Sequence, residues 1–180
     1  MALREILTFP DPRLAAKAEP VSVVDDEIRT LIDDMFETMY HARGVGLAAT
    51  QIGVLQRVVV VDCGERPETD DPEAPLQPAE PVAVVNPRVA SAEGKIVWEE
   101  GCLSVPGYYD QVERASNVVI TGLDRNGEAV QIPASGLLGV CLQHEIDHLE
   151  GTLFIDHLSR LKQSVVKKKL RRKASAEAVA

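Results

Sequence analysis

The stretch that decides the fold is Gln143-His144-Glu145-Ile146-Asp147-His148-Leu149-Glu150-Gly151, near the C-terminal end of the chain. If it is helical, His144 and His148 lie one turn apart on one face, a spacing at which two imidazoles can bind one metal ion. Glu145 adds a carboxylate that can carry a proton. The bland alternative is a surface helix that merely contains two histidines. The glutamate next to the first histidine favours metal-assisted hydrolysis, for which the chain must supply a third ligand.

Two cysteines compete to be that third ligand. Cys141 lies on nearly the same helical stripe as the histidines, but at 1.5 Å per residue it is about 10 Å along the axis from His148. A metal–sulfur bond is about 2.3 Å long, so the short cysteine side chain would hardly reach the ion. Cys102 follows Gly101 at the end of an expected strand and approaches from a separate loop. We therefore choose Cys102, with Cys141 packing beneath the site and Cys63 as a spectator.

Length and composition indicate one soluble domain. The chain has 180 residues, of which 45% are hydrophobic, enough for a single sizeable core. No apolar run approaches the roughly 18–20 residues that a membrane span requires, and the first residues lack a secretory h-region, so we expect a cytoplasmic protein. The three cysteines are irregularly spaced, which argues against a disulfide framework and leaves thiol chemistry or metal binding open.

The charge is unevenly distributed. The formal net charge is -9, yet a short segment near the C-terminus is strongly basic. An acidic body argues against a broad nucleic-acid-binding face and against specific DNA binding. The basic segment is either a solvated helix end or a contact for RNA or another polyanion. Its basic residues are Lys167, Lys168, Lys169, Arg171, Arg172 and Lys173.

Hydrophobic periodicity and turn residues predict the order of elements. Residues 1–20 suit an extended arm, and residues 25–43 an amphipathic helix that Gly44 ends. Leu161, Val165 and Leu170 are available to pack a last helix on the core. Ser135 can cap the helix that carries the histidines. The expected strands are 57–62, 81–87, 95–98, 117–123 and 128–132, the histidine helix is 136–150, and the last helix is 159–173.

The predicted fold class is therefore α+β, with antiparallel strands wrapped around a central helix that carries the histidines. An N-terminal amphipathic helix and a C-terminal helix complete it. The whole chain, 1–180, is expected to be one domain. Within it, residues 65–80 form a loop insert rich in proline and acidic residues, and residues 164–180 form a basic, partly helical tail.

A small, apolar loop carries one amide side chain. It runs Gly44-Val45-Gly46-Leu47-Ala48-Ala49-Thr50-Gln51-Ile52-Gly53. A phosphate-binding loop would need further glycines or a lysine, so we reject that interpretation. Gln51 is either a hydrogen-bonded structural amide or a donor aimed at a ligand oxygen.

Three stretches together resemble the signature motifs of a known family. They are Gly44-Val45-Gly46-Leu47-Ala48-Ala49-Thr50-Gln51-Ile52, Glu100-Gly101-Cys102-Leu103-Ser104 and Gln143-His144-Glu145-Ile146-Asp147-His148. In this order they resemble the motifs G-x-G-L-A-A-x-Q, E-G-C-L-S and Q-H-E-x-D-H of the bacterial peptide deformylases. The resemblance covers nearly the whole chain. It implies removal of the formyl group from the N-terminal formylmethionine of newly made polypeptides, with release of formate.

The resemblance also implies a role for each matching residue. Cys102, His144 and His148 would be the metal ligands, with water as the fourth. Glu145 would be the general acid/base, taking a proton from the water that attacks the formyl carbon. Gln51 and the backbone N–H of Leu103 would stabilise the oxyanion. The implied metal is Fe(II), with Zn, Ni or Co as substitutes; a thiolate with two imidazoles does not itself choose among them.

The substrate contacts are implied in the same way. Tyr109 occupies a position that is arginine in many members, a departure where the downstream peptide would meet a charge. The insert at 65–80 is longer than in the shortest members. The residues expected to bind substrate are Gly44, Val45, Gly46, Trp98, Glu100, Gly101, Leu137, Val140 and Cys141.

Two other functions fit parts of the sequence. A zinc endopeptidase shares the H-E-x-x-H spacing, but its third ligand is usually a downstream Glu or His, which Cys102 fits poorly. A non-catalytic, metal-stabilised binding protein would not need Glu145. The basic tail suggests one further partner, the ribosome, where nascent chains emerge.

Overall fold

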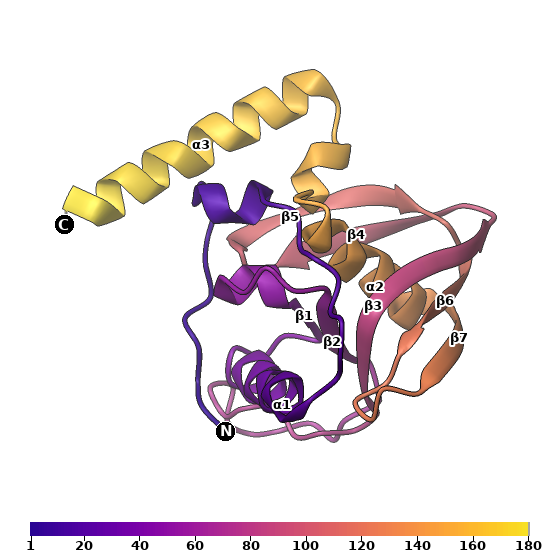
Figure 1. Cartoon of the computed structure of the whole chain (residues 1–180). Helices are drawn as coiled ribbons and strands as arrows, with labels where there is room; N and C mark the ends of the chain where they lie inside the picture. Colours follow the sequence, from indigo (N-terminus) through magenta and orange to yellow (C-terminus); the bar gives the residue numbers. More distant parts are fainter. Residues whose placement is uncertain (180) are drawn as a thin grey trace.

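The structure, a computed structural model, describes residues 1–179 and shows strands and helices gathered around one central helix (Figure 1). Within this range the α-helices are α1 (Asp26–His41), α2 (Gly136–Leu149) and α3 (Arg160–Val179). Short 3-10 helices are η1 (Pro12–Ala15), η2 (Ala49–Ile52) and η3 (Phe154–His157). The strands are β1 (Gly46–Ala48), β2 (Val58–Asp62), β3 (Pro81–Glu93), β4 (Ile96–Cys102), β5 (Val105–Arg114), β6 (Asn117–Leu123) and β7 (Ala129–Ser135).

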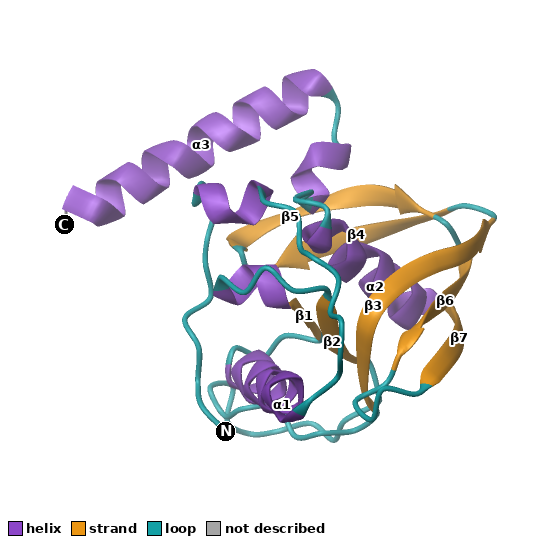
Figure 2. Cartoon of the chain, in the orientation of Figure 1, coloured by secondary structure: helices purple, strands orange, loops and turns teal. Residues whose placement is uncertain are grey.

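The strands form two antiparallel sheets. Five strands pair in the order β1-β2-β3-β6-β7, while β4 and β5 form a separate hairpin. Helix α2 packs against β1, β2, β6 and β7 of the larger sheet, and Figure 2 shows the strands arranged around it. This arrangement confirms the predicted α+β class with antiparallel strands around the histidine helix. Among residues 1–179, no helix combines the length and the apolar content needed to cross a membrane.

The core forms where apolar runs meet. Every residue of β2 is buried, which explains its unbroken Val58-Val59-Val60-Val61 run. Helix α1 presents Ile32, Met35 and Met39 to the same core, all fully buried. Its N-terminus is capped, since the Asp25 carboxylate accepts a hydrogen bond from the Ile28 N–H.

Two helix ends differ from the prediction in detail. Arg43, and not Gly44, takes the left-handed conformation after α1, with φ 58°, and the Gly44 N–H bonds back to the Met39 carbonyl. Ser135 precedes α2 but makes no side-chain capping bond. At the other end, Gly151 has φ +74°, and a Cβ there would lie 2.4 Å from the Ala15 carbonyl oxygen. Glycine is required where α2 stops because of both the backbone angle and the close approach.

The prediction missed two strands, the short β1 and the longer β5. Residues 105–114 form β5, although Pro106 and Gly107 indicate a turn in the sequence. The turn lies earlier, between the paired residues Cys102 and Val105, so β4 runs on through Cys102. Proline is tolerated here because it stands beside the end of a two-stranded hairpin. Strand β3 likewise continues to Glu93, beyond the expected end at 87.

Helix α3 packs through a face that agrees with the expected one only at Leu170. Val166 is buried, and Leu170, one turn later, packs with it on a cluster that includes Val112 and Phe154. Leu161 and Val165 are instead 78% and 60% exposed. The helix also extends beyond residue 173, to Val179, along the outside of the molecule (Figure 1).

Candidate active site

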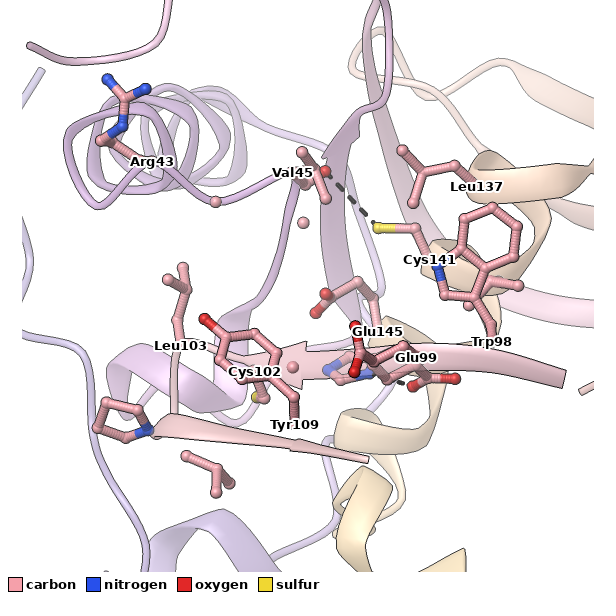
Figure 3. A pocket seen from close by; sticks show the side chains of 18 of the residues that line it. Arg43, Val45, Trp98, Glu99, Cys102, Leu103, Tyr109, Leu137, Cys141 and Glu145 are labelled. Carbon is pink, nitrogen blue, oxygen red and sulfur yellow. Dashed lines mark hydrogen bonds and ion pairs between the residues drawn. The ribbon is translucent and has the colours of Figure 1, made fainter. Parts of the chain in front are cut away.

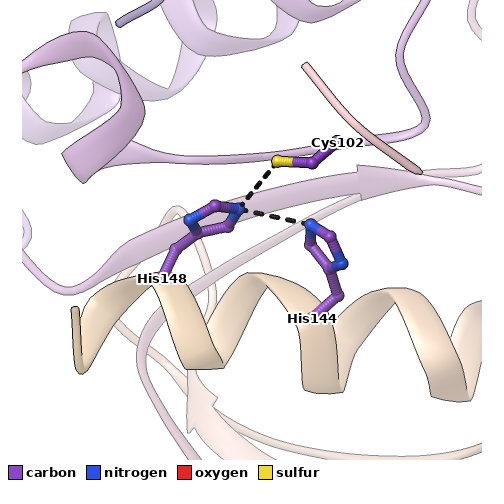
Figure 4. A group of neighbouring side chains, drawn as sticks. All are labelled: Cys102, His144 and His148. Atoms are coloured by element: carbon purple, nitrogen blue, oxygen red, sulfur yellow. Dashed lines mark hydrogen bonds between the residues drawn. The ribbon is translucent and has the colours of Figure 1, made fainter. Parts of the chain in front are cut away.

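Three metal-binding side chains converge where the end of β4 meets α2 (Figure 4). The Nε2 atoms of His144 and His148 lie 3.2 Å apart, and the Cys102 Sγ lies 3.3 Å from the His148 Nε2. All three ligand atoms lie within 4.8 Å of one another. Two imidazole nitrogens bound to one tetrahedral ion at about 2.05 Å would be about 3.3 Å apart. The three residues therefore fit a divalent metal ion.

The His144 ring is oriented by a buried carboxylate. Its Nδ1 lies 2.8 Å from the Glu100 Oε1, and Arg114 grips the same carboxylate through two bonds of 2.8 and 2.9 Å. Burial acts to raise the pKa of Glu100, but the hydrogen bonds from Arg114 and His144 prevail and hold that pKa below its ordinary value. Because ionised Glu100 only accepts, it selects the tautomer with the proton on Nδ1 and leaves Nε2 free for a metal.

The ion pair between Glu100 and Arg114 is extended by further polar side chains that lead away from the site. Arg114 also pairs with Asp147, and the His157 Nε2 lies 2.7 Å from the same aspartate. Burial acts to raise the pKa of Asp147, whereas hydrogen bonds from His157 and Arg114 lower it below the ordinary value. The sequence predicted no such role for His157. A chain of hydrogen bonds and ion pairs thus runs from a partly exposed histidine to the His144 ring.

Gln51 lies beside Cys102 with both the oxygen and the nitrogen of its amide hydrogen-bonded. It is 1% exposed, its Oε1 accepts the Ala48 N–H at 2.9 Å, and its Nε2 donates to the Ser104 Oγ at 3.0 Å. The same Nε2 lies 3.6 Å from the Cys102 Sγ. The two sequence interpretations of Gln51 are therefore compatible, since the bonds that satisfy the amide also aim it at the metal-binding group.

The N-terminal arm braces these two loops. The Leu7 N–H donates to the Gln51 carbonyl at 2.7 Å, and the Phe9 N–H donates to the Ser104 carbonyl at 2.8 Å. Leu7 and Phe9 belong to no helix or strand, so this part of the arm is held by backbone bonds and fixes the loops from outside. The loops that carry Gln51 and Cys102 are thus supported on both sides.

Glu145 is buried at 4% exposure beside the three ligands. Burial raises the pKa of its carboxyl to about 7, the strongest influence on it. A Cβ on Gly46 would lie 2.5 Å from the Glu145 Oε1, so the carboxylate lies directly against β1. Among residues 1–179 the other oxygen, Oε2, has no hydrogen-bond partner. A buried carboxyl with a free oxygen is suited to accept and return a proton.

A cavity of about 450 Å³ opens onto this group, between the Gly44–Gly46 segment, the β4–β5 hairpin and α2 (Figure 3). His148 does not line this cavity, and its ring meets Cys102 and His144 from the side away from the cavity. Five lining residues were not predicted, namely Arg43, Glu99, Val105, Pro106 and Gly107. The predicted residues that line it are Gly44, Val45, Gly46, Gln51, Trp98, Glu100, Gly101, Cys102, Leu103, Leu137, Val140, Cys141, His144 and Glu145.

Tyr109 and Arg43 stand at the cavity in different ways. The Tyr109 ring lies against Gly101, where a Cβ would be 2.5 Å from its Cε1. Glycine at 101 is thus needed to seat the ring beside Cys102. Arg43 borders the cavity, but its guanidinium points away from it and donates to the Ala74 carbonyl (Figure 3). The position at which the resemblance implies arginine is therefore aromatic, and the arginine that lines the cavity is turned outward.

Known proteins resemble this chain in both sequence and fold. A model of the polypeptide deformylase family matches residues 3–164. A peptide deformylase of Alkalilimnicola ehrlichii is 51% identical over 170 residues, which cover 94% of this chain and 90% of the relative. The crystal structure of a peptide deformylase from Legionella pneumophila has a TM-score of 0.84 and 48% identity, covering 98% of each chain.

A third comparison concerns a structure with a bound peptide. A peptide deformylase from Acinetobacter baumannii, solved with Met-Ala-Ser bound, has a TM-score of 0.77 and 35% identity. The match covers 87% of this chain and 99% of that one. Sequence, fold and the Cys102, His144 and His148 group thus agree, and the chain belongs to the polypeptide deformylase family.

Proposed function

We propose that this protein removes the N-formyl group from formylmethionine at the start of newly made polypeptides, releasing formate, with Cys102, His144 and His148 holding the metal ion. The observation that carries the proposal is the convergence of these three ligand atoms, within 4.8 Å, beside a cavity lined by Cys102, His144 and Glu145. Membership of the deformylase family supports the same reaction. The Met-Ala-Ser bound to the Acinetobacter relative supports a methionine-first peptide as the ligand.

We infer that Fe²⁺ is the ion, with Zn²⁺, Ni²⁺ or Co²⁺ able to replace it. One thiolate and two imidazoles suit iron and zinc alike, so this choice rests on the family resemblance. When bound, the ion supplies Lewis-acid polarisation of the formyl oxygen and a lowered pKa for water.

Glu145 handles the proton in this proposal. Its free oxygen faces the space beside the ligands, so it accepts a proton from the attacking water. When the C–N bond breaks, the same carboxyl returns the proton to the departing amine, which becomes the new N-terminus. The burial that raises the pKa of Glu145 to about 7 suits a group that must both take and give a proton near neutrality.

Gln51 and Leu103 stabilise the oxyanion. The Gln51 Nε2 is held near Cys102 by its bond to Ser104, so its direction is set before substrate arrives. The Leu103 N–H follows Cys102 directly in the turn between β4 and β5. Two donors fixed in this way need no rearrangement when charge develops on the formyl oxygen.

The cavity wall receives the methionine side chain. Val140 and Cys141 are buried on α2, Leu137 precedes them by one turn, and Trp98 closes the wall from β4. Val45 supports the opposite side, while the backbone of Gly44 and Gly46 lets an extended peptide approach closely. An apolar slot of this kind favours methionine over a polar first residue.

The test is a formate-release assay with formyl-Met-Ala-Ser on protein purified without oxygen, together with metal analysis. We expect about one metal ion per chain, taking one ion per three-ligand site, formate release, and no cleavage of an internal peptide bond in an unformylated peptide. Cleavage of the internal bond without formate would instead identify an endopeptidase. Metal-loaded protein that does neither would overturn the proposal.

The basic tail suggests where the enzyme works. We infer that the exposed lysines and arginines of α3 contact ribosomal RNA in the cytoplasm, close to the emerging substrate. Their charge contrasts with the overall formal charge of -9, which supports a localised polyanion contact. We likewise propose that residues 1–180 work as one domain, with the insert at 65–80 as a surface loop.

A further inference from the structure

Two thiols outside the metal-binding group meet at the back of the cavity wall. Cys63 directly follows β2, and Cys141 lies in the middle of α2. Cys63 packs against the apolar cluster that contains Cys141, together with Val61 and Leu142. The Val45 carbonyl oxygen contacts both β2 and α2, because it accepts hydrogen bonds from the Asp62 N–H at 2.8 Å and from the Cys141 thiol at 3.6 Å. Figure 3 shows this thiol directed at Val45 from the cavity wall.

The two side chains also influence each other's ionisation. The neighbouring Cys141 lowers the pKa of Cys63 below its ordinary value, more than burial raises it. The neighbouring Cys63, followed by burial, raises the pKa of Cys141 well above its ordinary value. Cys63 is partly exposed, whereas Cys141 is buried. The pair therefore combines a partly exposed thiol of lowered pKa with a buried thiol of raised pKa, the arrangement of a reactive and a resolving cysteine.

We propose that Cys63 and Cys141 are a modification site for small hydroperoxides, which join them in a disulfide and thereby slow the deformylation proposed above. In the first step the Cys63 thiolate attacks hydrogen peroxide: an S–O bond forms, the O–O bond breaks, and hydroxide leaves. The Cys141 sulfur then attacks Cys63, so an S–S bond forms and the S–O bond breaks. The hydroxide released from Cys63 in this second step takes the Cys141 proton and leaves as water. The sulfurs lose two electrons, which the peroxide gains.

The disulfide would act on catalysis through the cavity wall. Bonded sulfurs are about 2.05 Å apart, so the Cys141 sulfur must leave its contact with Val45 and move toward β2. A Cβ on Gly46 would lie 2.7 Å from this sulfur and 2.5 Å from the Glu145 Oε1. The sulfur therefore shares its surroundings with the proposed general acid/base. An ångström-scale displacement beside reacting atoms can cost roughly a hundredfold in rate.

The experiment uses full-length protein loaded with Zn²⁺, which has no redox chemistry and keeps Cys102 coordinated. After exposure to hydrogen peroxide, peptide mapping should show the Cys63 and Cys141 peptides joined, with two hydrogen atoms lost. The value of kcat/KM for formyl-Met-Ala-Ser should fall by about tenfold to a hundredfold. Dithiothreitol should restore both the free peptides and the rate.

The matched control is Cys63→Ser, which changes one atom in a residue outside the cavity. It should equal the unmodified protein before peroxide and keep its rate afterwards. Equal inactivation of both proteins would show that Cys102 is the sensitive thiol and would overturn the inference. Free Cys63 and Cys141 peptides after oxidation would overturn it as well, as would a disulfide without any change in rate. Reduced protein that releases no formate would contradict the proposed function alone, because the mapping does not depend on activity.

Discussion

Glu145 combines burial with a free oxygen, and this combination makes a sharp prediction. Replacing it with glutamine keeps the shape of the side chain but removes its ability to accept a proton. General acid/base groups contribute about 10² to 10⁴ in rate. We therefore expect Glu145→Gln to lower kcat for formate release by that factor while binding the same amount of metal. A variant that keeps more than about a tenth of the rate would contradict the assignment.

Gln51 has a structural role and a proposed catalytic role, and two variants separate them. Gln51→Ala removes the proposed oxyanion donor, for which a loss of about 3 kcal/mol, or roughly a hundredfold in kcat, is expected. Ser104→Ala removes only the hydroxyl that orients the Gln51 amide, so its loss should be smaller. Steady-state kinetics with metal analysis checks both. Equal losses in the two variants would mean that positioning, and not oxyanion stabilisation, is what Gln51 contributes.

At the scale of elements, the β4–β5 hairpin supports α2 through Glu100. We predict that Glu100→Gln lowers metal affinity by about 10- to 100-fold, because the charge that orients His144 is lost. The rate of metal release to a chelator, followed by absorbance, measures this without reference to turnover. Glu113→Gln, an exposed position beside Arg114 on β5, is the matched control and should release metal at the original rate. Equal release rates for all three proteins would contradict the role of Glu100.

The same hairpin shows what the sequence could reveal. The spacing of His144, Glu145 and His148 is local to one helix, so it was visible directly. The ion pair between Glu100 and Arg114 could not be predicted, because it depends on how β4 pairs with β5. In addition, Pro106 and Gly107 hid β5 from the prediction altogether. The contact of Cys63 with Cys141 likewise joins a strand end to a helix far along the chain. Local periodicity therefore predicted elements and motifs, but not contacts that depend on register.

The insert between β2 and β3 is anchored by one aspartate. Asp62 is fully buried, and its carboxylate accepts the Ala79 and Glu80 N–H groups, each at 2.9 Å, as well as the Tyr40 hydroxyl at 2.7 Å. Burial acts to raise the pKa of Asp62, but these bonds hold it below the ordinary 3.8. The ionised form is thus favoured in the folded state. Its stabilisation is complete well above pH 3.8 and is lost as the pH falls through the lower folded pKa.

Asp62→Asn should accordingly destabilise the protein by about 3 kcal/mol at pH 7, because the amide presents donors to backbone N–H groups. The difference from the original protein should shrink as the pH is lowered below the ordinary aspartate pKa. Urea unfolding at a series of pH values measures both effects. Asp70→Asn, exposed in the same insert, should change neither. A destabilisation that does not depend on pH would show that ionisation of Asp62 is unimportant.

At the scale of the whole molecule, charge and packing are separated along α3. Val166 and Leu170 attach the helix to the body, while Lys168, Lys169 and Arg172 face solvent. Lys167 is partly engaged with Asp156 at 2.7 Å, and Arg171 lies over the Phe9 ring. Removing the tail would therefore expose apolar surface as well as delete charge. Reversing the exposed charges tests the ribosome contact without disturbing the attachment.

We predict that Lys168→Glu, Lys169→Glu and Arg172→Glu together abolish co-sedimentation with ribosomes at low salt, because attraction to RNA phosphates depends on these charges. The unchanged protein should sediment with ribosomes and be released as salt rises. Formate release from free formyl-Met-Ala-Ser should be the same in both, since the tail lies outside the cavity. The control reverses three exposed charges on the body, Lys17, Arg88 and Lys95, and should still co-sediment. Loss of binding in this control would indicate dependence on net charge, and undiminished binding by the tail variant would exclude α3 as the contact.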